Sequence, residues 1–462
     1  MILQLAAEGK LSLDDPLSKY FPDYPHPGAG ATVRQLLNHT SGIQSYTDIP
    51  GWMVEANFSK PFTNDQMIAV FRDLPSPSKP GEAWAYNNSC YFLLGAIIEK
   101  VTGKPWHQVV RERLAGPLQL TSLRYGVEEG SVANMARPYA AVDGKFGSAP
   151  TIHMSVPGAA GALIGTVGDL ATWADALHHG RVVDPASYKA MTTKGKTSDD
   201  KETTYGFGLQ ISEIRGHRTI GHGGGIPGFI TSSVYLPEND VFVAIFTNSA
   251  PPVTSPDEIA TKLAMLAIGD PFPELQKQPV DLKAVKPLLG LYKIDGEEAE
   301  RIFFASDGKL FTRRTGGSET EVFPAGNNRF FYDGSVTWFD MKPGATPVMH
   351  MYQSGAKTPQ LARRAGPVPA EEKPAEVARA TLERYVGRYA VGGAFAVVTL
   401  GADGLSMKLG PQPTLRLVPS SPTEFRVQGV DAKVAFNAEG DGPAKSLTIH
   451  QGGRTMEAPR AE

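Results

Sequence analysis

The expected fold is decided by two stretches: Trp84-Ala85-Tyr86-Asn87-Asn88-Ser89, and His222-Gly223-Gly224-Gly225 with Ile226-Pro227-Gly228-Phe229 directly after it. The first stretch leads into residues 90–103, where apolar residues at helical spacing predict a helix that ends at Gly103. The second stretch is a run of glycines, which leaves the backbone without side chains, so that another group can approach it closely.

Each stretch taken alone has an ordinary structural explanation. Tyr86-Asn87-Asn88 alone fits a turn with a buried tyrosine, and residues 221–225 alone fit a hairpin turn or a strained loop. The order of the motifs is more specific than any one of them. Residues 36–43 (Leu-Leu-Asn-His-Thr-Ser-Gly-Ile) come first, then the tyrosine stretch, the 90–103 helix, the glycine run, and strands after Phe229.

In this order the chain resembles the serine β-lactamase-like hydrolases, a family that includes class C β-lactamases, penicillin-binding proteins, esterases and D-aminopeptidases. Tyr86-x-Asn88 and His222-x-Gly224 correspond to two of the family's motifs. The resemblance implies an α+β fold, with helices and an antiparallel sheet in a β-lactamase/transpeptidase-like domain. It also implies hydrolysis of an ester, a small amide or a D-amino-acid peptide through an acyl-serine, without a metal or an organic cofactor.

Residue roles follow from the resemblance. Tyr86 is the expected base or proton shuttle, and Asn88 is the expected amide that bonds the family's lysine and the substrate. A phenol has a reference pKa near 10, so it needs nearby cations to act as a base at neutral pH. His222 stands where β-lactamases have lysine, and it can donate to Tyr86 or to the substrate. Because a histidine is only partly charged near pH 7, we expect weaker recognition of a β-lactam carboxylate than a lysine would give.

The same resemblance assigns the glycine run to substrate binding. Gly223, Gly224 and Gly225 are expected to line the substrate, and the Gly225 N–H is the expected oxyanion donor. We also expect Trp84 and Phe229 either to line the acyl pocket or to belong to the core.

The nucleophile of the family is the serine of a Ser-x-x-Lys motif that opens a buried helix. Four pairs fit this spacing, at Ser76/Lys79, Ser198/Lys201, Ser306/Lys309 and Ser354/Lys357. None of them opens an apolar helix, so no nucleophile is assigned within the 462 residues, and little or no turnover is expected of them as they stand. Two explanations stay open: a Ser-x-x-Lys shortly before Met1, or a pseudoenzyme that binds a ligand or has a regulatory role.

After Pro271 the sequence changes to short strands with glycine-rich turns. A weak repeat recurs at offsets of 96 to 98 residues, since Leu289-Gly290-Leu291-Tyr292 returns as Val386-Gly387-Arg388-Tyr389. Two small closed antiparallel barrels of lipocalin type are expected, because closure removes exposed strand edges. The predicted domains are 1–270 (hydrolase), 271–370 and 371–462 (barrels).

Composition excludes several classes of protein. The net charge of −3 gives no electrostatic footprint for nucleic acid. No apolar run reaches about 18 residues, so no membrane span is expected, and the single Cys90 excludes an intrachain disulfide. No His/Cys/Asp group has zinc spacing, so no metal is expected. The expected partner is a small-molecule substrate, a homo-oligomer is an open alternative, and the family favours a periplasmic or secreted location.

Local patterns give further predictions. Residues 205–211 alternate as a strand, and residues 232–246 read as two strands joined by a turn at 237–240. Thr166 and Asp169 have the spacing of a capping box before a helix. His39 is expected to be structural and to bond backbone at a helix end, and Cys90 is expected to be buried and inert.

Overall fold

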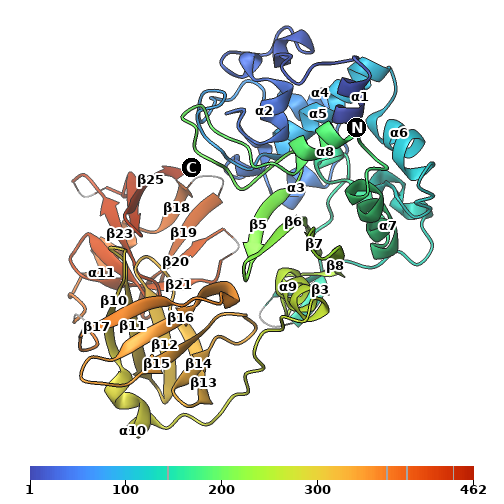
Figure 1. Cartoon of the computed structure of the whole chain (residues 1–462). Coiled ribbons are helices and arrows are strands. Elements are labelled where there is room, and N and C mark those ends of the chain that lie inside the picture. Colours follow the sequence, from blue (N-terminus) through green and yellow to red (C-terminus); the bar gives the residue numbers. More distant parts are fainter. Residues whose placement is uncertain (143–144, 371–372, 392–393, 411, 441, 462) are drawn as a thin grey trace. The chain divides into compact units, whose positions relative to one another are not determined.

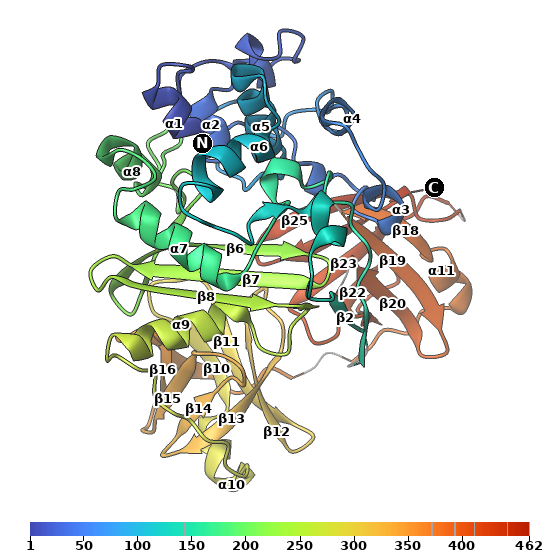
Figure 2. The ribbon, with the colours of Figure 1, turned by 90° about the vertical axis from the view of Figure 1, so that its right-hand side faces the viewer.

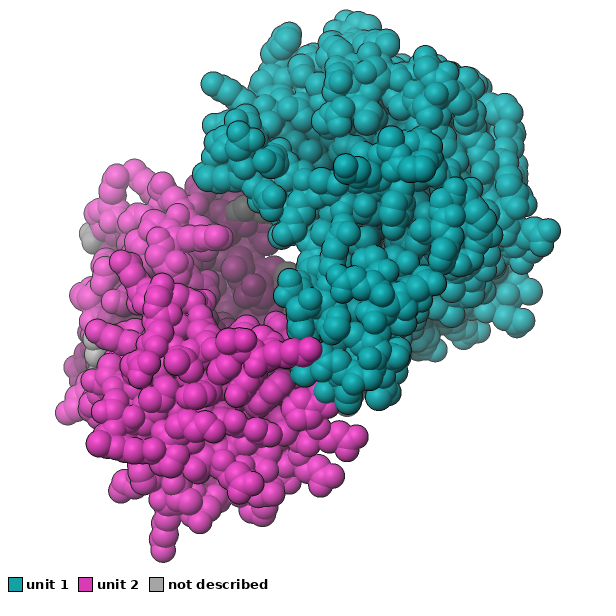
Figure 3. Space-filling view, viewed as in Figure 1, with its two compact units in different colours: residues 1–271 teal, residues 272–462 magenta. Residues whose placement is uncertain are grey.

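The computed structural model describes residues 1–142, 145–370, 373–391, 394–410, 412–440 and 442–461. These residues divide into two units, Met1–Pro271 and Phe272–Glu462 (Figure 3). In the described part of the chain, no helix is long and apolar enough to cross a membrane.

The first unit is built from short helices and an antiparallel sheet (Figure 1). Its helices are α1 (Ile2–Ala7), α2 (Val33–Leu37), α3 (Glu55–Phe58), α4 (Asn64–Ala69), α5 (Asn88–Thr102), α6 (Trp106–Val110), α7 (Val167–His178), α8 (Pro185–Met191) and α9 (Pro256–Ala267). The main sheet has the order β5 (Gln210–Ile214), β6 (His217–Ile226), β7 (Phe229–Leu236) and β8 (Val241–Thr247). Smaller sheets contain β1 (Arg124–Tyr125) with β4 (Leu163–Ile164), and β3 (Lys145–Ser148), β2 (Tyr139–Val142) and β9 (Ser249–Ala250). Helix α9 packs on β7 and β8, and α7 also contacts β8 (Figure 2).

Helix α5 lies in the core of this unit, and its bounds confirm the helix predicted from the sequence. Asn87 is the N-cap, and its side-chain oxygen accepts from the Cys90 N–H at 3.2 Å. Gly103 follows the helix with φ +68°, a left-handed conformation that favours glycine. The buried side of α5 includes Leu93 and Ile97, which have no exposed surface. Cys90 is also fully buried, as predicted, and burial raises the pKa of its thiol to about 12.

The predicted capping box at α7 is only half formed. Thr166 caps the helix by accepting from the Asp169 N–H at 3.3 Å. The Asp169 carboxylate does not return to the Thr166 backbone. It accepts instead from the backbone N–H of Ser122 at 2.7 Å and of Leu123 at 3.2 Å. A carboxylate can satisfy several donors, so Asp169 fastens the segment before β1 to the start of α7.

The main sheet confirms one strand prediction and corrects another. β7 and β8 are joined by a turn at residues 237–240, as expected from the sequence. The strand predicted over residues 205–211 is wrong, because β5 begins only at Gln210. Gly208 has φ +75°, and a Cβ on Gly206 would lie 1.9 Å from the Met191 carbonyl oxygen. These two glycines turn residues 206–209 into a tight loop, and Tyr205 pairs with Gln210 across it as an isolated antiparallel bridge.

The second unit consists of two closed eight-stranded antiparallel barrels, which confirms the predicted fold class (Figure 1). The first barrel follows α10 (Leu282–Val285) and contains β10 (Gly290–Ile294), β11 (Glu300–Ser306), β12 (Lys309–Arg314), β13 (Thr320–Gly326), β14 (Arg329–Phe331), β15 (Trp338–Lys342), β16 (Val348–Tyr352) and β17 (Gln360–Gly366). The second follows α11 (Arg379–Glu383) and contains β18 (Gly387–Val391), β19 (Ala394–Gly401), β20 (Gly404–Leu409), β21 (Leu415–Pro419), β22 (Glu424–Val427), β23 (Ala432–Asn437), β24 (Ser446–Gln451) and β25 (Arg454–Ala461).

The sequence repeat corresponds to equivalent positions in the two barrels. Tyr292 in β10 and Tyr389 in β18 both lack exposed surface. Each donates its hydroxyl proton to the carbonyl four residues upstream, Leu288 in the first barrel and Tyr385 in the second. The shared hydrogen bond holds the segment that enters each barrel against its first strand.

Candidate active site

The structure brings the two motif stretches together. Tyr86 directly precedes the capped end of α5, and His222 lies in β6. Their ring centroids are 5.9 Å apart. Tyr86 is 41% exposed, so its ring forms part of an accessible surface.

The two asparagines after Tyr86 have different surroundings. Asn87 is buried, caps α5, and donates from Nδ2 to the Ile43 carbonyl. Asn88 is half-buried, and its amide nitrogen lies 3.5 Å from Thr47 Oγ1, at the limit of a hydrogen bond. Asn87 is therefore structural, whereas the Asn88 amide retains hydrogen-bonding capacity for a ligand.

The glycine run forms one edge of the sheet. β5 pairs with β6 only as far as Gly221, whereas β7 pairs with β6 through Ile226. Residues 222–226 therefore have strand partners on one side only, within the described chain. A Cβ on Gly221 would lie 2.1 Å from the Ser233 carbonyl oxygen, so packing requires this glycine. A Cβ on Gly225 would meet only Ile230 Cδ1, at 3.3 Å, so the sheet itself tolerates more than glycine there.

The hydrogen bonds of His222 differ from the expected ones. Its Nδ1 lies against the Gly223 carbonyl, and its Nε2 lies 2.8 Å from the Tyr205 hydroxyl. A carbonyl oxygen only accepts, so Nδ1 carries the proton and Nε2 accepts from Tyr205. Burial lowers the pKa of His222, which keeps the imidazole neutral. The ring faces Tyr86, but neither nitrogen donates to it.

Tyr86 is a neutral phenol in this setting. Burial raises the pKa of its hydroxyl, and no cation among the described residues opposes that effect. The hydroxyl also has no hydrogen-bond partner in the described chain. A group that approaches this exposed ring can therefore bond the Tyr86 hydroxyl, but a positive charge is needed beside the phenol before it can serve as a base near pH 7.

His39 packs beneath Tyr86 and is structural in the predicted way. It is 2% exposed, and its Nδ1 accepts from the Asn87 N–H at 3.1 Å, at the cap of α5. Its ring centroid lies 4.4 Å from that of Tyr86 and 4.7 Å from that of Tyr205. Burial, with His222 nearby, lowers the pKa of His39 to about 3. A neutral imidazole thus supports the ring of Tyr86.

Tyr205 was missed by the sequence analysis because its segment read as a strand. Its side chain is 1% exposed and contacts the rings of His39, Tyr86 and His222. The glycines at 206 and 208 were the available signal, because two glycines in five residues favour a loop over a strand.

The two aromatic residues proposed for the acyl pocket lie in different surroundings. Trp84 is 37% exposed, with its ring 6.3 Å from that of Tyr205, so it belongs to the rim of the site. Phe229 is half-buried at the start of β7. Its ring forms no aromatic contact with the site tyrosines within the described residues.

The structure places no Ser-x-x-Lys pair at the start of a described helix. Ser76 lies in a loop, and Ser198 lies in a turn where its N–H donates to the Gly81 carbonyl at 2.7 Å. Ser306 ends β11, and Ser354 follows β16 with φ +50°. None of these serines occupies the setting that the family's nucleophile requires.

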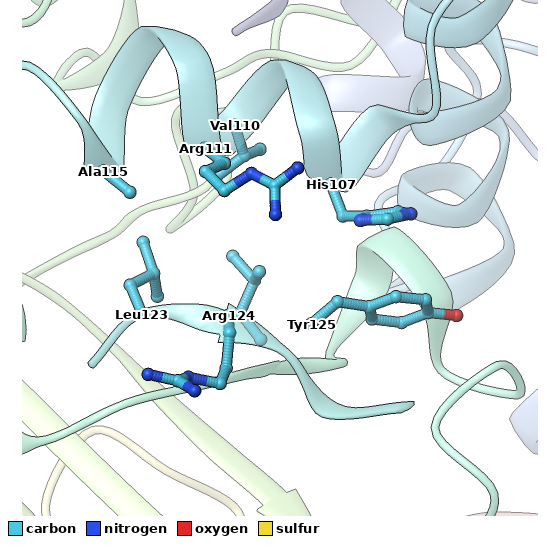
Figure 4. Close-up of a pocket in the computed structure, with 8 residues that line it drawn as sticks. His107, Val110, Arg111, Ala115, Leu123, Arg124 and Tyr125 are labelled. Carbon is cyan, nitrogen blue, oxygen red and sulfur yellow. The ribbon is translucent and has the colours of Figure 1, made fainter. Parts of the chain in front are cut away.

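Two small cavities lie apart from these residues. One, of about 20 Å³, is lined by His107, Val110, Arg111, Ala115, Leu123, Arg124, Tyr125 and Leu163 (Figure 4). It has room for about one water molecule. The other, of about 260 Å³, includes Tyr24, Phe71 and Arg72 in its wall. Neither contains Tyr86, His222 or Tyr205, so the chemistry of the site rests on the motif residues.

Comparison with known proteins agrees with this architecture. A penicillin-binding protein of Bacillus subtilis is 24% identical over 354 residues, which cover 71% of this chain and 77% of that protein. A D-aminopeptidase of Brucella ovis is 25% identical over 56% of this chain and 49% of its own length. The solved octameric penicillin-binding protein homologue from Pyrococcus abyssi has a TM-score of 0.54 at 23% identity, covering 79% of this chain and 85% of that one, and supports the fold alone.

The sequence profile of the family described as beta-lactamase matches residues 1–267, which is more than half of the chain. That range contains Tyr86, Asn88, His222 and the glycine strand. The chain therefore belongs to the β-lactamase family of serine hydrolases.

Proposed function

We propose that this chain carries the substrate cleft of a serine hydrolase that cleaves an ester, a small amide or a D-amino-acid peptide. The observation that carries the proposal is the juxtaposition of Tyr86 and His222 beside an edge strand of glycines. The similarity to a D-aminopeptidase gives further support for an amide or peptide substrate.

In the proposed reaction the serine oxygen attacks the substrate carbonyl, and its proton passes to the phenolate form of Tyr86, which requires the lysine ammonium beside it. The carbonyl oxygen becomes an oxyanion, to which the N–H of Gly225 donates. Tyr86 then returns the proton to the leaving alcohol or amine as the acyl-serine forms. Asn88 holds the acyl part through its free amide. Water then attacks the acyl carbonyl and gives its proton to Tyr86, and Tyr86 returns that proton to the serine oxygen as its bond to the acyl group breaks. These steps use no metal or organic cofactor.

The serine and its lysine are proposed to come from sequence outside residues 1–462. The support is chemical: the pKa of Tyr86 is raised by burial, and a lysine ammonium beside the phenol is the cation that would lower it. The alternative is a pseudoenzyme that binds a ligand in the same cleft. It is favoured by the settings of the four Ser-x-x-Lys pairs, since none of them opens a described helix.

Because His222 is neutral, the proposal favours esters and D-aminoacyl amides over β-lactams. The carboxylate of a β-lactam would be bound by the lysine that β-lactamases have at the position of His222. A periplasmic or secreted location, and association of copies of this chain, stay predictions.

The proposal is tested by reading the coding sequence upstream of the Met1 codon and expressing any in-frame extension. An extended protein with a Ser-x-x-Lys should react covalently with a fluorophosphonate probe, and Ser→Ala in that motif should abolish labelling. Residues 1–462 alone serve as the matched control and should stay unlabelled. If no Ser-x-x-Lys precedes Met1 in frame, the hydrolase proposal fails, and ligand binding becomes the function to assay.

A further inference from the structure

Tyr205 is the residue whose hydroxyl contacts His222. It lies in the loop before β5, and Tyr205 N–H and the Tyr205 carbonyl both bond the Thr203 hydroxyl, at 3.3 and 3.0 Å. The Gly195 N–H also donates to that carbonyl, at 2.8 Å. With its backbone fixed and its side chain buried, the Tyr205 hydroxyl has a set position 2.8 Å from His222 Nε2.

We propose that Tyr205 determines the substrate-charge preference of the cleft by donating its hydroxyl proton to His222 Nε2, which leaves the imidazole with no free donor for a substrate carboxylate. This inference rests on the proposed function, because it concerns the substrate of the same site. Tyr205 acts through His222 and is therefore a positioning residue.

The direction of both hydrogen bonds follows from the acceptors. The Gly223 carbonyl cannot donate, so it requires the proton on Nδ1. Nε2 then has only a lone pair, and the tyrosine must supply the proton between them. Burial raises the pKa of Tyr205 far above its usual range, so the hydroxyl keeps its proton at any working pH.

The other groups that face His222 do not favour a charged imidazole. The ring of Tyr86 lies 5.9 Å away, and His39 is a neutral imidazole whose charge would repel a second one. No carboxylate of the described residues acts on the pKa of His222. A protonated His222 would therefore force the Tyr205 hydroxyl to change from donor to acceptor, and it would gain no anionic partner.

Removal of the tyrosine hydroxyl should reverse this preference. In Tyr205→Phe the Nε2 lone pair is released, and we expect the pKa of His222 to rise by about one, the effect of losing one typical hydrogen bond to the neutral form. A protonated Nε2 can then donate to a carboxylate with a charge-assisted bond. We expect carboxylate binding relative to a neutral analogue to improve by about tenfold at pH 6.

The test is a pH titration of the full chain labelled with ¹⁵N-histidine, with His222→Gln used to assign the signal. Wild type should show His222 with its proton on Nδ1 and an unprotonated Nε2 at pH 8, and its titration should lie below that of an unburied histidine. Tyr188→Phe is the matched control, because Tyr188 bonds a different imidazole, His178, at 2.9 Å. The control should perturb His178 and leave His222 unchanged. A wild-type His222 with its proton on Nε2, or an unchanged titration in Tyr205→Phe, would overturn the inference.

A second measurement compares the Kd of N-acetyl-D-alanyl-D-alanine with that of its C-terminal amide, for both proteins at pH 6. The amide should bind wild type more tightly, and Tyr205→Phe should shift the ratio toward the carboxylate. An unchanged ratio would contradict the role in specificity. If the chain binds neither probe, the proposed function is contradicted. The histidine titration does not depend on binding, so it still tests whether Tyr205 controls His222.

Discussion

Replacement of Asn87 by alanine should destabilise the first unit much more than the same change at its neighbour Asn88. Asn87 caps α5 and also donates to the Ile43 carbonyl, so alanine removes two hydrogen bonds at once. Loss of the cap costs about 1 kcal/mol, and a buried carbonyl left without a donor costs about 1–3 kcal/mol. Together these give a loss of about 2–4 kcal/mol in the free energy of unfolding.

The assay is urea denaturation followed by tryptophan fluorescence, since four of the five tryptophans lie in the first unit, namely Trp52, Trp84, Trp106 and Trp173. With a slope of about 2 kcal/mol per molar urea, the midpoint should fall by about 1–2 M. Asn88→Ala is the control. It breaks a single contact at 3.5 Å and should cost less than about 0.5 kcal/mol. Equal losses for the two variants would refute the division between a structural Asn87 and a ligand-facing Asn88.

Two further predictions concern the glycine strand and acid stability. Gly221→Ala should lower the free energy of unfolding by about 2 kcal/mol, measured from the melting temperature, because its Cβ would overlap the Ser233 carbonyl. Gly225→Ala should change it by less than about 1 kcal/mol. A larger loss for Gly225→Ala than for Gly221→Ala would contradict the sheet register. His39 is neutral in the fold, with a pKa of about 3, whereas the unfolded chain takes up a proton near 6.5. Acidification therefore favours the unfolded chain, and stability should fall by up to about 1.4 kcal/mol per pH unit from about pH 6.5 to about pH 3. The control variant is His39→Asn, because asparagine tolerates the φ of +62° at this position. Its free energy of unfolding should change less with pH than that of wild type. An unchanged slope would argue against His39 as the titrating group.

Much of the fold was accessible from the sequence because its signals were local. The apolar spacing through α5 and the stop at Gly103 lie within one helix, and they predicted it correctly, whereas the cap at Asn87 came only from the structure. The two barrels were predicted because a repeat doubles the weak signal of each short strand, and Tyr292 and Tyr389 occupy the same place in both.

The parts of the site that escaped prediction depend on contacts between distant segments. The alternating residues around Tyr205 fit a strand, but Gly206 packs against the Met191 carbonyl and Gly208 has a positive φ, and together they form a loop. The spacing of Asp169 fits a cap, but the carboxylate has stronger partners in the segment before β1. The bonds of His222 to Gly223 and Tyr205 could not be read from a motif, since motif spacing does not fix a tautomer.

The central claim is that Tyr86 transfers the proton during acylation in this cleft. Its most direct test is to measure kcat/KM on D-phenylalanine p-nitroanilide for the protein that contains the Ser-x-x-Lys motif, with and without Tyr86→Phe. Tyr125→Phe is the control, because the ring of Tyr125 lines the small cavity of Figure 4. Tyr86→Phe should lower kcat/KM by about 10²–10⁴-fold, while Tyr125→Phe should leave it near that of wild type. A wild-type rate in Tyr86→Phe would contradict the assignment of Tyr86.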